Sequence, residues 1–197
     1  MERADIKELY FITPITNVVS ILQHGILSHE LSKKLSHESI AMEDVQSRRK
    51  NKQIPGAGKL HEYANLYFDA HNPMLSKRRG QNNQICILCV NPSVLDLPGV
   101  IISDRNAASG WARFYTVSAG LAALDKDKIY ARYWINANNQ YEAWENKSLK
   151  CAEVLIPYRV EPKYVIGAHV ANQTALKAFK ELKIQLTVCI KNDIFFF

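Results

Sequence analysis

Short apolar runs separated by polar turns make up most of this chain, and they favour β-strands over long helices. Residues 84–90 read Gln-Ile-Cys-Ile-Leu-Cys-Val, a continuous apolar run typical of a strand that is covered on both faces. The predicted strands are residues 9–13, 66–71, 84–90, 100–103, 150–156, 164–167 and 186–190. So many short strands in one chain predict that a sheet forms the centre of the fold.

Three stretches have the pattern of helices. We expect Asn17 to cap a short helix that runs through Val18, and Gly25 to end that helix. The other two predicted helices are residues 40–49 and 173–182. An aromatic-rich segment between the fourth and fifth predicted strands reads instead as a loop, and it contains Tyr130, Tyr133, Trp134, Tyr141 and Trp144.

This order of elements predicts an α+β fold with a split or sandwiched sheet rather than a doubly wound α/β fold. The chain contains neither Gly-x-Gly-x-x-Gly nor a Gly-Lys-Ser/Thr phosphate loop, so a Rossmann or kinase-like fold has little support. With 197 residues, 47% of them hydrophobic, the chain can bury a core of its own. We therefore expect one domain that covers residues 1–197.

The charge balance permits a polyanionic partner without requiring one, since the formal net charge is +6. Two basic clusters lie beside turn-rich sequence: Arg48, Arg49, Lys50 and Lys52 form the first, and Lys77, Arg78 and Arg79 the second. Basic loops of this kind can contact phosphates, but a solvated surface explains either cluster equally well.

The chain carries no sign of membrane insertion. Its first five residues, Met-Glu-Arg-Ala-Asp, lack the apolar core of a signal peptide. No apolar run approaches the roughly 20 residues that cross a bilayer. We expect a cytoplasmic protein with no membrane partner.

Cys86 and Cys89 have the spacing of a metal-binding or redox pair, but their setting argues against that role. Both lie in the apolar run 84–90, where residues three apart point to opposite faces of a strand. No second pair of this spacing exists among the four cysteines, which also include Cys151 and Cys189. We expect core residues that stay reduced.

Glu153 is the one carboxylate within the strand-like run 150–156. If both faces of that strand are covered, Glu153 is a rigidly held and partly desolvated acid, as active sites often require. If the strand lies at the edge of the sheet, Glu153 faces water. The strand by itself favours the second interpretation, because a lone glutamate is seldom catalytic.

An ordered set of short motifs covers nearly the whole chain. The motifs are Leu9-Tyr10-Phe11-Ile12-Thr13 with Asn17, Gly25-Ile26-Leu27, Ser39-Ile40-Ala41, Val45-Gln46-Ser47-Arg48-Arg49, Gly58-Lys59-Leu60-His61-Glu62-Tyr63, Tyr67-Phe68, Asn72-Pro73-Met74-Leu75, Asp104 with Asn106, Ala131-Arg132-Tyr133-Trp134 and Ala152-Glu153-Val154-Leu155. Each motif is weak alone, but their order resembles the DarT family, the DNA ADP-ribosyltransferase toxins of bacterial toxin–antitoxin systems.

The resemblance implies an ADP-ribosyltransferase-like split antiparallel β core with flanking helices, NAD+ as co-substrate in a central cleft, and no metal. It also implies that Arg48 and Glu153 are the catalytic pair. Cleavage of the nicotinamide–ribose bond builds positive charge on the ribose, which a carboxylate can stabilise. From the residues alone, Arg48 would instead pair with Asp44 one helical turn earlier, a contact worth roughly 0.2–0.5 kcal/mol.

The resemblance also assigns residues to the NAD+ cleft: Phe11, Thr13, Asn17, Gly25, Leu27, Tyr67, His71 and Met74. Phe11 departs from the family pattern, since many members carry His at this position and a Phe side chain cannot donate a hydrogen bond. His71 has an equally good alternative as a loop histidine bonded to backbone.

For DNA, the resemblance points to aromatic residues ahead of Glu153 and to the basic clusters. The candidates are Tyr133, Trp134, Tyr141 and Trp144 for base stacking and Arg49, Lys77, Arg78 and Arg79 for phosphates. For each of these aromatic residues, the alternative is that it packs in the hydrophobic core.

The implied reaction is mono-ADP-ribosylation of a base in single-stranded DNA with release of nicotinamide, and thymine is favoured over guanine. The implied role is that of a growth-arresting toxin whose partner is a DarG-like macrodomain antitoxin. We expect a monomer. Alternatives that stay open are modification of RNA or protein by the same cleft, and a catalytically inactive nucleic-acid-binding domain.

Overall fold

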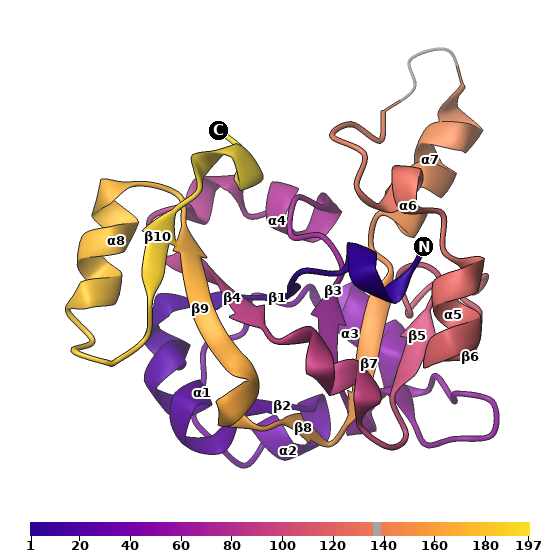
Figure 1. Cartoon of the computed structure of the whole chain (residues 1–197), viewed down its shortest axis with the longest axis horizontal. Coiled ribbons are helices and arrows are strands. Elements are labelled where there is room, and N and C mark those ends of the chain that lie inside the picture. The colour runs from indigo at the N-terminus through magenta and orange to yellow at the C-terminus, as the bar shows by residue number, and fades with distance from the viewer. Residues whose placement is uncertain (136–138) are drawn as a thin grey trace.

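The computed structural model describes residues 1–135 and 139–197, and its centre is an eight-stranded sheet (Figure 1). The strands are β1 Leu9–Pro14, β3 Tyr63–Tyr67, β4 Ile85–Val90, β5 Ile101–Ser103, β6 Phe114–Thr116, β7 Glu153–Pro157, β9 Val165–Val170 and β10 Val188–Ile190. Their order is β10-β9-β4-β1-β3-β7-β5-β6, and only β9 and β10 run parallel. A small second sheet pairs β2 (Ile26–Leu27) with β8 (Arg159–Val160). The predicted α+β class is confirmed.

The eight-stranded sheet consists of two halves that meet at a single row of residues. β1 pairs with β4 along six residues, and β3 pairs with β7 along five. Between β1 and β3 the only paired residues are Tyr10 and Tyr67. Because β1 continues beyond this pair without β3 beside it, a wedge opens between residues 11–14 and residues 63–66.

Short helices surround the sheet. They are α1 Val18–His24, α2 His29–Ser32, α3 Glu43–Lys50, α4 Pro73–Ser76, α5 Val117–Ala123, α6 Lys126–Ile129, α7 Gln140–Leu149 and α8 Gln173–Lys180. Three-residue to five-residue 3-10 turns occur at Arg3–Asp5, Ile15–Asn17, Leu60–Glu62, Arg79–Gln81, Pro92–Asp96, Pro162–Tyr164 and Asn192–Ile194. The three predicted helices correspond to α1, α3 and α8. In the described part of the chain, no helix has the length and apolarity needed to cross a bilayer.

β4 lies inside the first half of the sheet and is buried along its whole length. Its alternate residues face two separate cores, so that Cys86 and Leu88 belong to the larger core while Ile85 and Ile87 belong to a smaller one. Cys89 shares the side of Ile87 and contacts His169 of β9. The prediction that Cys86 and Cys89 face opposite sides is confirmed, and both thiols are free.

Four strands differ clearly from the prediction. Residues 66–71 contribute only the end of β3, because the Asp69 carboxylate accepts the backbone N–H of His71 at 2.9 Å and turns the chain. β2, β6 and β8 were not predicted at all. They have only two or three residues each, too few for an alternating pattern, and they form because β2 pairs with β8 and β5 pairs with β6.

Asn17 does not cap α1 as the sequence predicts. A 3-10 turn precedes the helix, so the backbone of Asn17 is already helical and its side chain makes no cap bond. The Asn17 amide instead bonds both backbone groups of Glu38, donating to its carbonyl at 2.7 Å and accepting its N–H at 3.0 Å. Asn17 thereby fastens the segment around Glu38 to the start of α1.

The predicted aromatic loop is partly helical. Tyr141 and Trp144 lie on α7, which begins where the Asn139 side chain accepts the backbone N–H of Glu142. Asn139 is a typical N-cap residue, and it is the local sequence feature that could have predicted this helix. In Figure 1, α7 stands away from the sheet at the side of β7 and β5.

Gly25 ends α1 as predicted, and substitution to Ala is expected to lower the free energy of unfolding. Its φ of +89° is unfavourable for a side chain, and a Cβ would lie 2.3 Å from the carbonyl oxygen of Val160. Gly56 is the matched control, since its φ is +70° but a Cβ would meet nothing within 4 Å. Gly56→Ala should cost about 1 kcal/mol from backbone strain alone.

Gly25→Ala should cost clearly more in urea unfolding, because β8 must also move. Equal losses in the two variants would contradict a role for the Val160 contact.

Candidate active site

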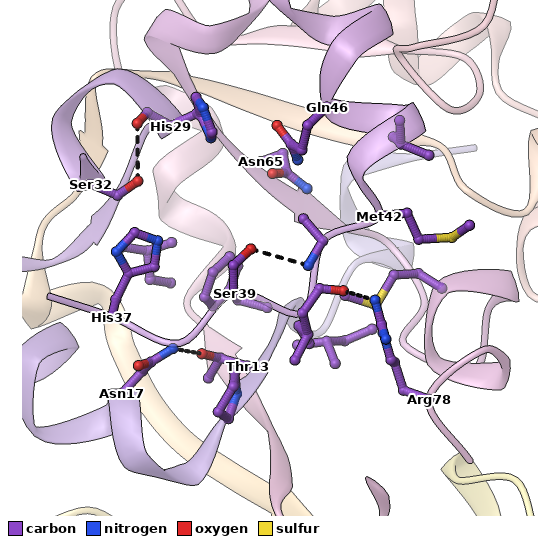
Figure 2. A pocket seen from close by; sticks show the side chains of 18 of the residues that line it. Thr13, Asn17, His29, Ser32, His37, Ser39, Met42, Gln46, Asn65 and Arg78 are labelled. Carbon is purple, nitrogen blue, oxygen red and sulfur yellow. Dashed lines mark hydrogen bonds between the residues drawn. The ribbon is translucent and has the colours of Figure 1, made fainter. Parts of the chain in front are cut away.

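A cavity of about 500 Å³ occupies the wedge between the two halves of the sheet. Its walls come from β1, α1, α3, β3 and the segment of residues 35–42. In Figure 2, Thr13 and Asn17 lie on one side of the cavity, and Gln46 and Asn65 lie on the other. Pockets of roughly 300–1,000 Å³ hold small molecules and cofactors in other proteins. The failure of β1 and β3 to pair beyond one row therefore makes room for a ligand.

Most of the residues assigned to the NAD+ cleft line this cavity. They are Phe11, Thr13, Asn17, Gly25, Leu27, Tyr67 and Met74. His71 does not line it. The Nδ1 atom of His71 bonds the backbone carbonyl of Ile194 at 2.7 Å, and its ring stacks on Phe196 with centroids 4.0 Å apart. His71 is therefore a loop histidine bonded to the backbone, the alternative that the sequence left open. It lies against the C-terminal segment, and this position does not support the expected contact with NAD+.

The Glu153 side chain is buried beside the cavity in a network that uses both carboxylate oxygens. Arg49 of α3 donates three hydrogen bonds to it, at 3.0, 3.1 and 3.1 Å. The backbone N–H of Ala107 donates a fourth at 2.9 Å. Glu153 is 1% exposed because β7 lies between β3 and β5. The alternative of an edge strand with Glu153 in water is wrong.

Arg48, which the resemblance makes the catalytic partner of Glu153, does not contact that carboxylate, whereas the adjacent Arg49 does. Successive residues on a helix point about 100° apart, so only one of the two arginines can face β7. Arg48 is exposed and reaches Asp44 at 3.5 Å, the i,i+4 pair expected from the residues alone. Arg48 still lines the cavity, as does Arg49. The two arginines therefore occupy different positions in one site.

Burial and the Glu153 charge together shift the pKa values of Arg49 and Tyr67. Burial opposes the charge on Arg49, but the adjacent Glu153 carboxylate outweighs this effect and raises the pKa of Arg49. Burial, and then the Glu153 charge, raise the pKa of Tyr67, which keeps its hydroxyl neutral. Tyr67 is the direct cross-strand neighbour of Glu153 and also the residue that joins β3 to β1. The ion pair thus lies on the row at which the sheet divides.

Two histidines that the sequence did not connect lie side by side at the cavity, with their rings tilted by 35°. The rings of His29 and His61 are 4.1 Å apart, and His29 lines the cavity (Figure 2). The buried His61 bonds the side chain of Gln46 through Nε2 at 3.1 Å. Burial, His29 and then Arg49 lower the pKa of His61 to about 4. His61 belongs to the motif of residues 58–63, but no sequence signal connects it with His29, because the two histidines are distant in the chain.

The basic residues expected to contact DNA occupy three different settings. Lys77 and Arg78 line the cavity, and Arg78 also donates to the backbone carbonyl of Ile40. Arg79 is exposed in the next turn. Arg49 does not fit this role, because its guanidinium is buried against Glu153 rather than open to a phosphate.

The expected stacking aromatics also differ in their exposure. Tyr133, Tyr141 and Trp144 are 80%, 73% and 52% exposed. Trp134 instead packs edge-on against Phe196, with ring centroids 5.7 Å apart. The first three are open to a partner, whereas Trp134 is partly used by the fold.

Comparison with known proteins decides the family. Residues 10–196 match the family model described as DarT, ssDNA thymidine ADP-ribosyltransferase. The chain belongs to the DarT family. Its predicted family and enzyme class, a DNA ADP-ribosyltransferase, are confirmed, and the family's description agrees with the preference for thymine.

Two curated DarT relatives cover almost all of this chain. A DNA ADP-ribosyl transferase from Thermus sp. (strain 2.9) is 28% identical over 206 residues, which cover 95% of each chain. A DNA ADP-ribosyl transferase–DNA ADP-ribosyl glycohydrolase fusion protein from Thermosipho africanus is 30% identical over 201 residues. That match covers 97% of this chain and 50% of the fusion protein, so this chain spans about half of that relative.

Solved DarT structures have the same fold. The Thermus sp. 2.9 DarT in complex with ADP-ribosylated ssDNA superposes with a TM-score of 0.82 at 26% identity, covering 98% of this chain and 97% of that one. The NAD+ complex of the same DarT gives a TM-score of 0.76 at 25% identity, with 98% of each chain covered. The split sheet described above is therefore a DarT architecture.

Arg49→Met is expected to destabilise this DarT-family chain by about 3–5 kcal/mol, since the Glu153 carboxylate would stay buried without its charge partner. Arg48→Met is the matched control and should change the free energy of unfolding by less than about 0.5 kcal/mol. Urea unfolding of both variants checks this. Equal effects would show that the two arginines are interchangeable for stability.

A pH effect is expected from His61. The pKa of His61 is about 4 in the folded protein against a usual value of 6.5. Between these pH values the unfolded chain binds a proton that the folded chain does not. The free energy of unfolding should therefore fall as the pH drops from 6.5 to 4 and level off below that. Urea midpoints across this range should depend less on pH in His61→Gln; an unchanged slope would contradict the assignment.

Proposed function

We propose that this chain transfers ADP-ribose from NAD+ to thymine in single-stranded DNA, releases nicotinamide, and thereby acts as a toxin. The observation that carries this proposal is the Arg49–Glu153 pair, buried beside a 500 Å³ cavity at the split of a DarT-type sheet. The solved DarT complexes with NAD+ and with ADP-ribosylated ssDNA support it.

The cavity wall suggests how NAD+ is held. Thr13 and Asn17 offer polar groups on one side (Figure 2), and Tyr67 and Met74 also line the cavity. Phe11 lines the same cavity but has no side-chain donor, so β1 contributes there through apolar contact and backbone alone. Arg48, exposed and on the cavity wall, is suited to the pyrophosphate, because a guanidinium matches phosphate oxygens.

In the proposed reaction, the bond between nicotinamide and the ribose breaks and the base nitrogen bonds the same ribose carbon. Nicotinamide is a cationic leaving group and departs neutral, so that no acid is needed. Glu153 stabilises the positive charge that develops on the ribose and accepts the proton that the base nitrogen loses. Arg49 holds the Glu153 carboxylate in place until the substrates bind, and it then stabilises the negative charge that develops on the base.

Glu153 has to gain access to substrate for these roles, since Arg49 and the N–H of Ala107 now occupy its oxygens. Arg49 lines the cavity and Glu153 does not. We therefore propose that Arg49 meets the substrates first and that its displacement uncovers Glu153.

For the DNA strand, the exposed Tyr133, Tyr141 and Trp144 offer stacking surfaces, and Lys77 and Arg78 offer positive charge at the cavity. We propose a DarG-like macrodomain antitoxin as the partner, supported by the fusion of a DNA ADP-ribosyl transferase to a DNA ADP-ribosyl glycohydrolase in Thermosipho africanus.

Labelled NAD+ incubated with single-stranded DNA, RNA and protein substrates tests the reaction. We expect label on thymine-containing single-stranded DNA, with mass spectrometry of nucleosides locating it on thymine. Glu153→Gln should lower the rate by at least about 100-fold, because it removes the charge and keeps the shape. Glu181→Gln makes the same chemical change on the exposed end of α8 and should leave the rate unchanged. Label on RNA or protein only, or full activity of Glu153→Gln, would overturn the proposal.

Substitutions of Arg49 and Arg48 should change different kinetic constants in the same assay. Arg49→Lys is expected to lower the turnover rate, because a lysine cannot reproduce the forked contact with Glu153. Arg48→Lys should chiefly raise the KM for NAD+, as loss of a phosphate contact does. A thermal melt shows whether each variant folds. The reverse pattern would return the catalytic assignment to Arg48.

A further inference from the structure

A second cluster of chemically active side chains lies outside the cavity, in the half of the sheet without Glu153. It consists of Glu8, directly before β1, Cys89 of β4 and His169 of β9. None of the three lines the cavity. Cys89 and His169 lie on adjacent strands at diagonal positions of one face, because His169 pairs with Ile87, two residues from Cys89.

The donor atoms of this Glu8–Cys89–His169 cluster are spaced like ligands of one metal ion. The Nε2 atom of His169 is 3.2 Å from the Cys89 sulfur and 3.4 Å from Oε2 of Glu8, and all three donor atoms lie within 4.8 Å of one another. Tetrahedral zinc, with bonds of about 2.0–2.3 Å, separates a sulfur from a nitrogen ligand by about 3.6 Å and a nitrogen from an oxygen ligand by about 3.4 Å.

We propose that Glu8, Cys89 and His169 bind a zinc ion that ties β1, β4 and β9 together. Sulfur, imidazole nitrogen and carboxylate oxygen are all ligands that zinc accepts, and calcium and magnesium are disfavoured because they bind oxygen. Water completes the coordination on the Glu8 side, since Glu8 is 29% exposed at its side chain and His169 only 7%.

The surroundings of His169 orient its ring for this role. Its other nitrogen, Nδ1, lies 3.1 Å from the sulfur of Cys189 on β10. Histidine ligands commonly donate their second ring N–H to a neighbouring acceptor, which leaves the other nitrogen free for the metal. With Nδ1 protonated toward Cys189, the lone pair of Nε2 points at Cys89 and Glu8. His169 therefore has a hydrogen-bond partner at Nδ1 in addition to Cys89 and Glu8 at Nε2.

Protonation states before binding are set by burial. Burial, and then the Glu8 charge, raise the pKa of Cys89, so that its thiol is protonated in the metal-free protein. Burial, and then Lys191, lower the pKa of His169, whose ring is neutral. Zinc binding therefore forms a sulfur–zinc bond, breaks the S–H bond of Cys89 and releases that proton to solvent.

The proposed ion has no part in ADP-ribosyl transfer. The resemblance implied a reaction without metal, and the cluster lies outside the cavity in which we place that reaction. The ion would act on stability, because a ligand that binds only the folded chain favours it.

Cobalt and zinc titrations of the chelator-treated protein test this proposal. Co²⁺ should give the visible bands of a tetrahedral site and a near-ultraviolet band from thiolate-to-cobalt charge transfer, and Zn²⁺ should abolish both. Zn²⁺ at a hundredfold excess over its Kd should raise Tm by roughly 5–10 °C. The charge-transfer band is decisive, because the other histidine cluster, His29 with His61, includes no cysteine.

Cys89→Ala should lose the charge-transfer band and the Tm increase. Cys86→Ala is the matched control, since it removes an equally buried thiol from the same strand on the opposite face and should keep both. Glu8→Gln, a change at the more exposed ligand, should weaken Co²⁺ binding at least tenfold and provides a test if Cys89→Ala does not fold. A wild-type protein without the band, or a band that survives in Cys89→Ala, would overturn the proposal and leave a Cys89–His169 hydrogen bond only.

Discussion

The buried ion pair between Arg49 and Glu153 is the interaction on which the site depends. Two charges removed from water are stable only when their hydrogen-bonding groups are satisfied, and here four donor contacts reach the two oxygens of Glu153. Three come from α3 and one from the backbone of Ala107. These contacts fix α3, β7 and the turn after β5 relative to one another. Of these elements, α3 and the turn after β5 contribute residues to the cavity wall.

The sheet places this pair at the point where its halves separate. One row runs from Tyr10 through Tyr67 and Glu153 to Ser103 and crosses four strands. Along this row the sheet is continuous, and beyond it β1 turns away with β4. A ligand in the wedge consequently has β1 on one side, and the row that contains Tyr67 and Glu153 closes the narrow end of the wedge. Rigid strands hold the carboxylate, whereas Arg49 sits on a short helix that can move with less disruption.

The two halves of the sheet hold different chemistry. The half with β3 and β7 carries the acid of the proposed reaction, and the half with β1, β4 and β9 carries the Glu8–Cys89–His169 cluster, none of whose residues lines the cavity. Because β1 both lines the cavity and follows directly after Glu8, an ion at the cluster would hold one wall of the cavity in place without touching its contents.

The sequence by itself determined the α+β class, most strands, the helix end at Gly25, the opposite orientation of Cys86 and Cys89, and the DarT resemblance, because strand alternation and motif order are local properties of the chain. Only the tertiary structure decided which residues from distant segments come into contact. It selected Arg49 over the adjacent Arg48, since the rotation of α3 against β7 determines which of them reaches Glu153. It buried Glu153 by placing β7 inside the sheet, and it brought Glu8 to Cys89 and His169, which no motif connects.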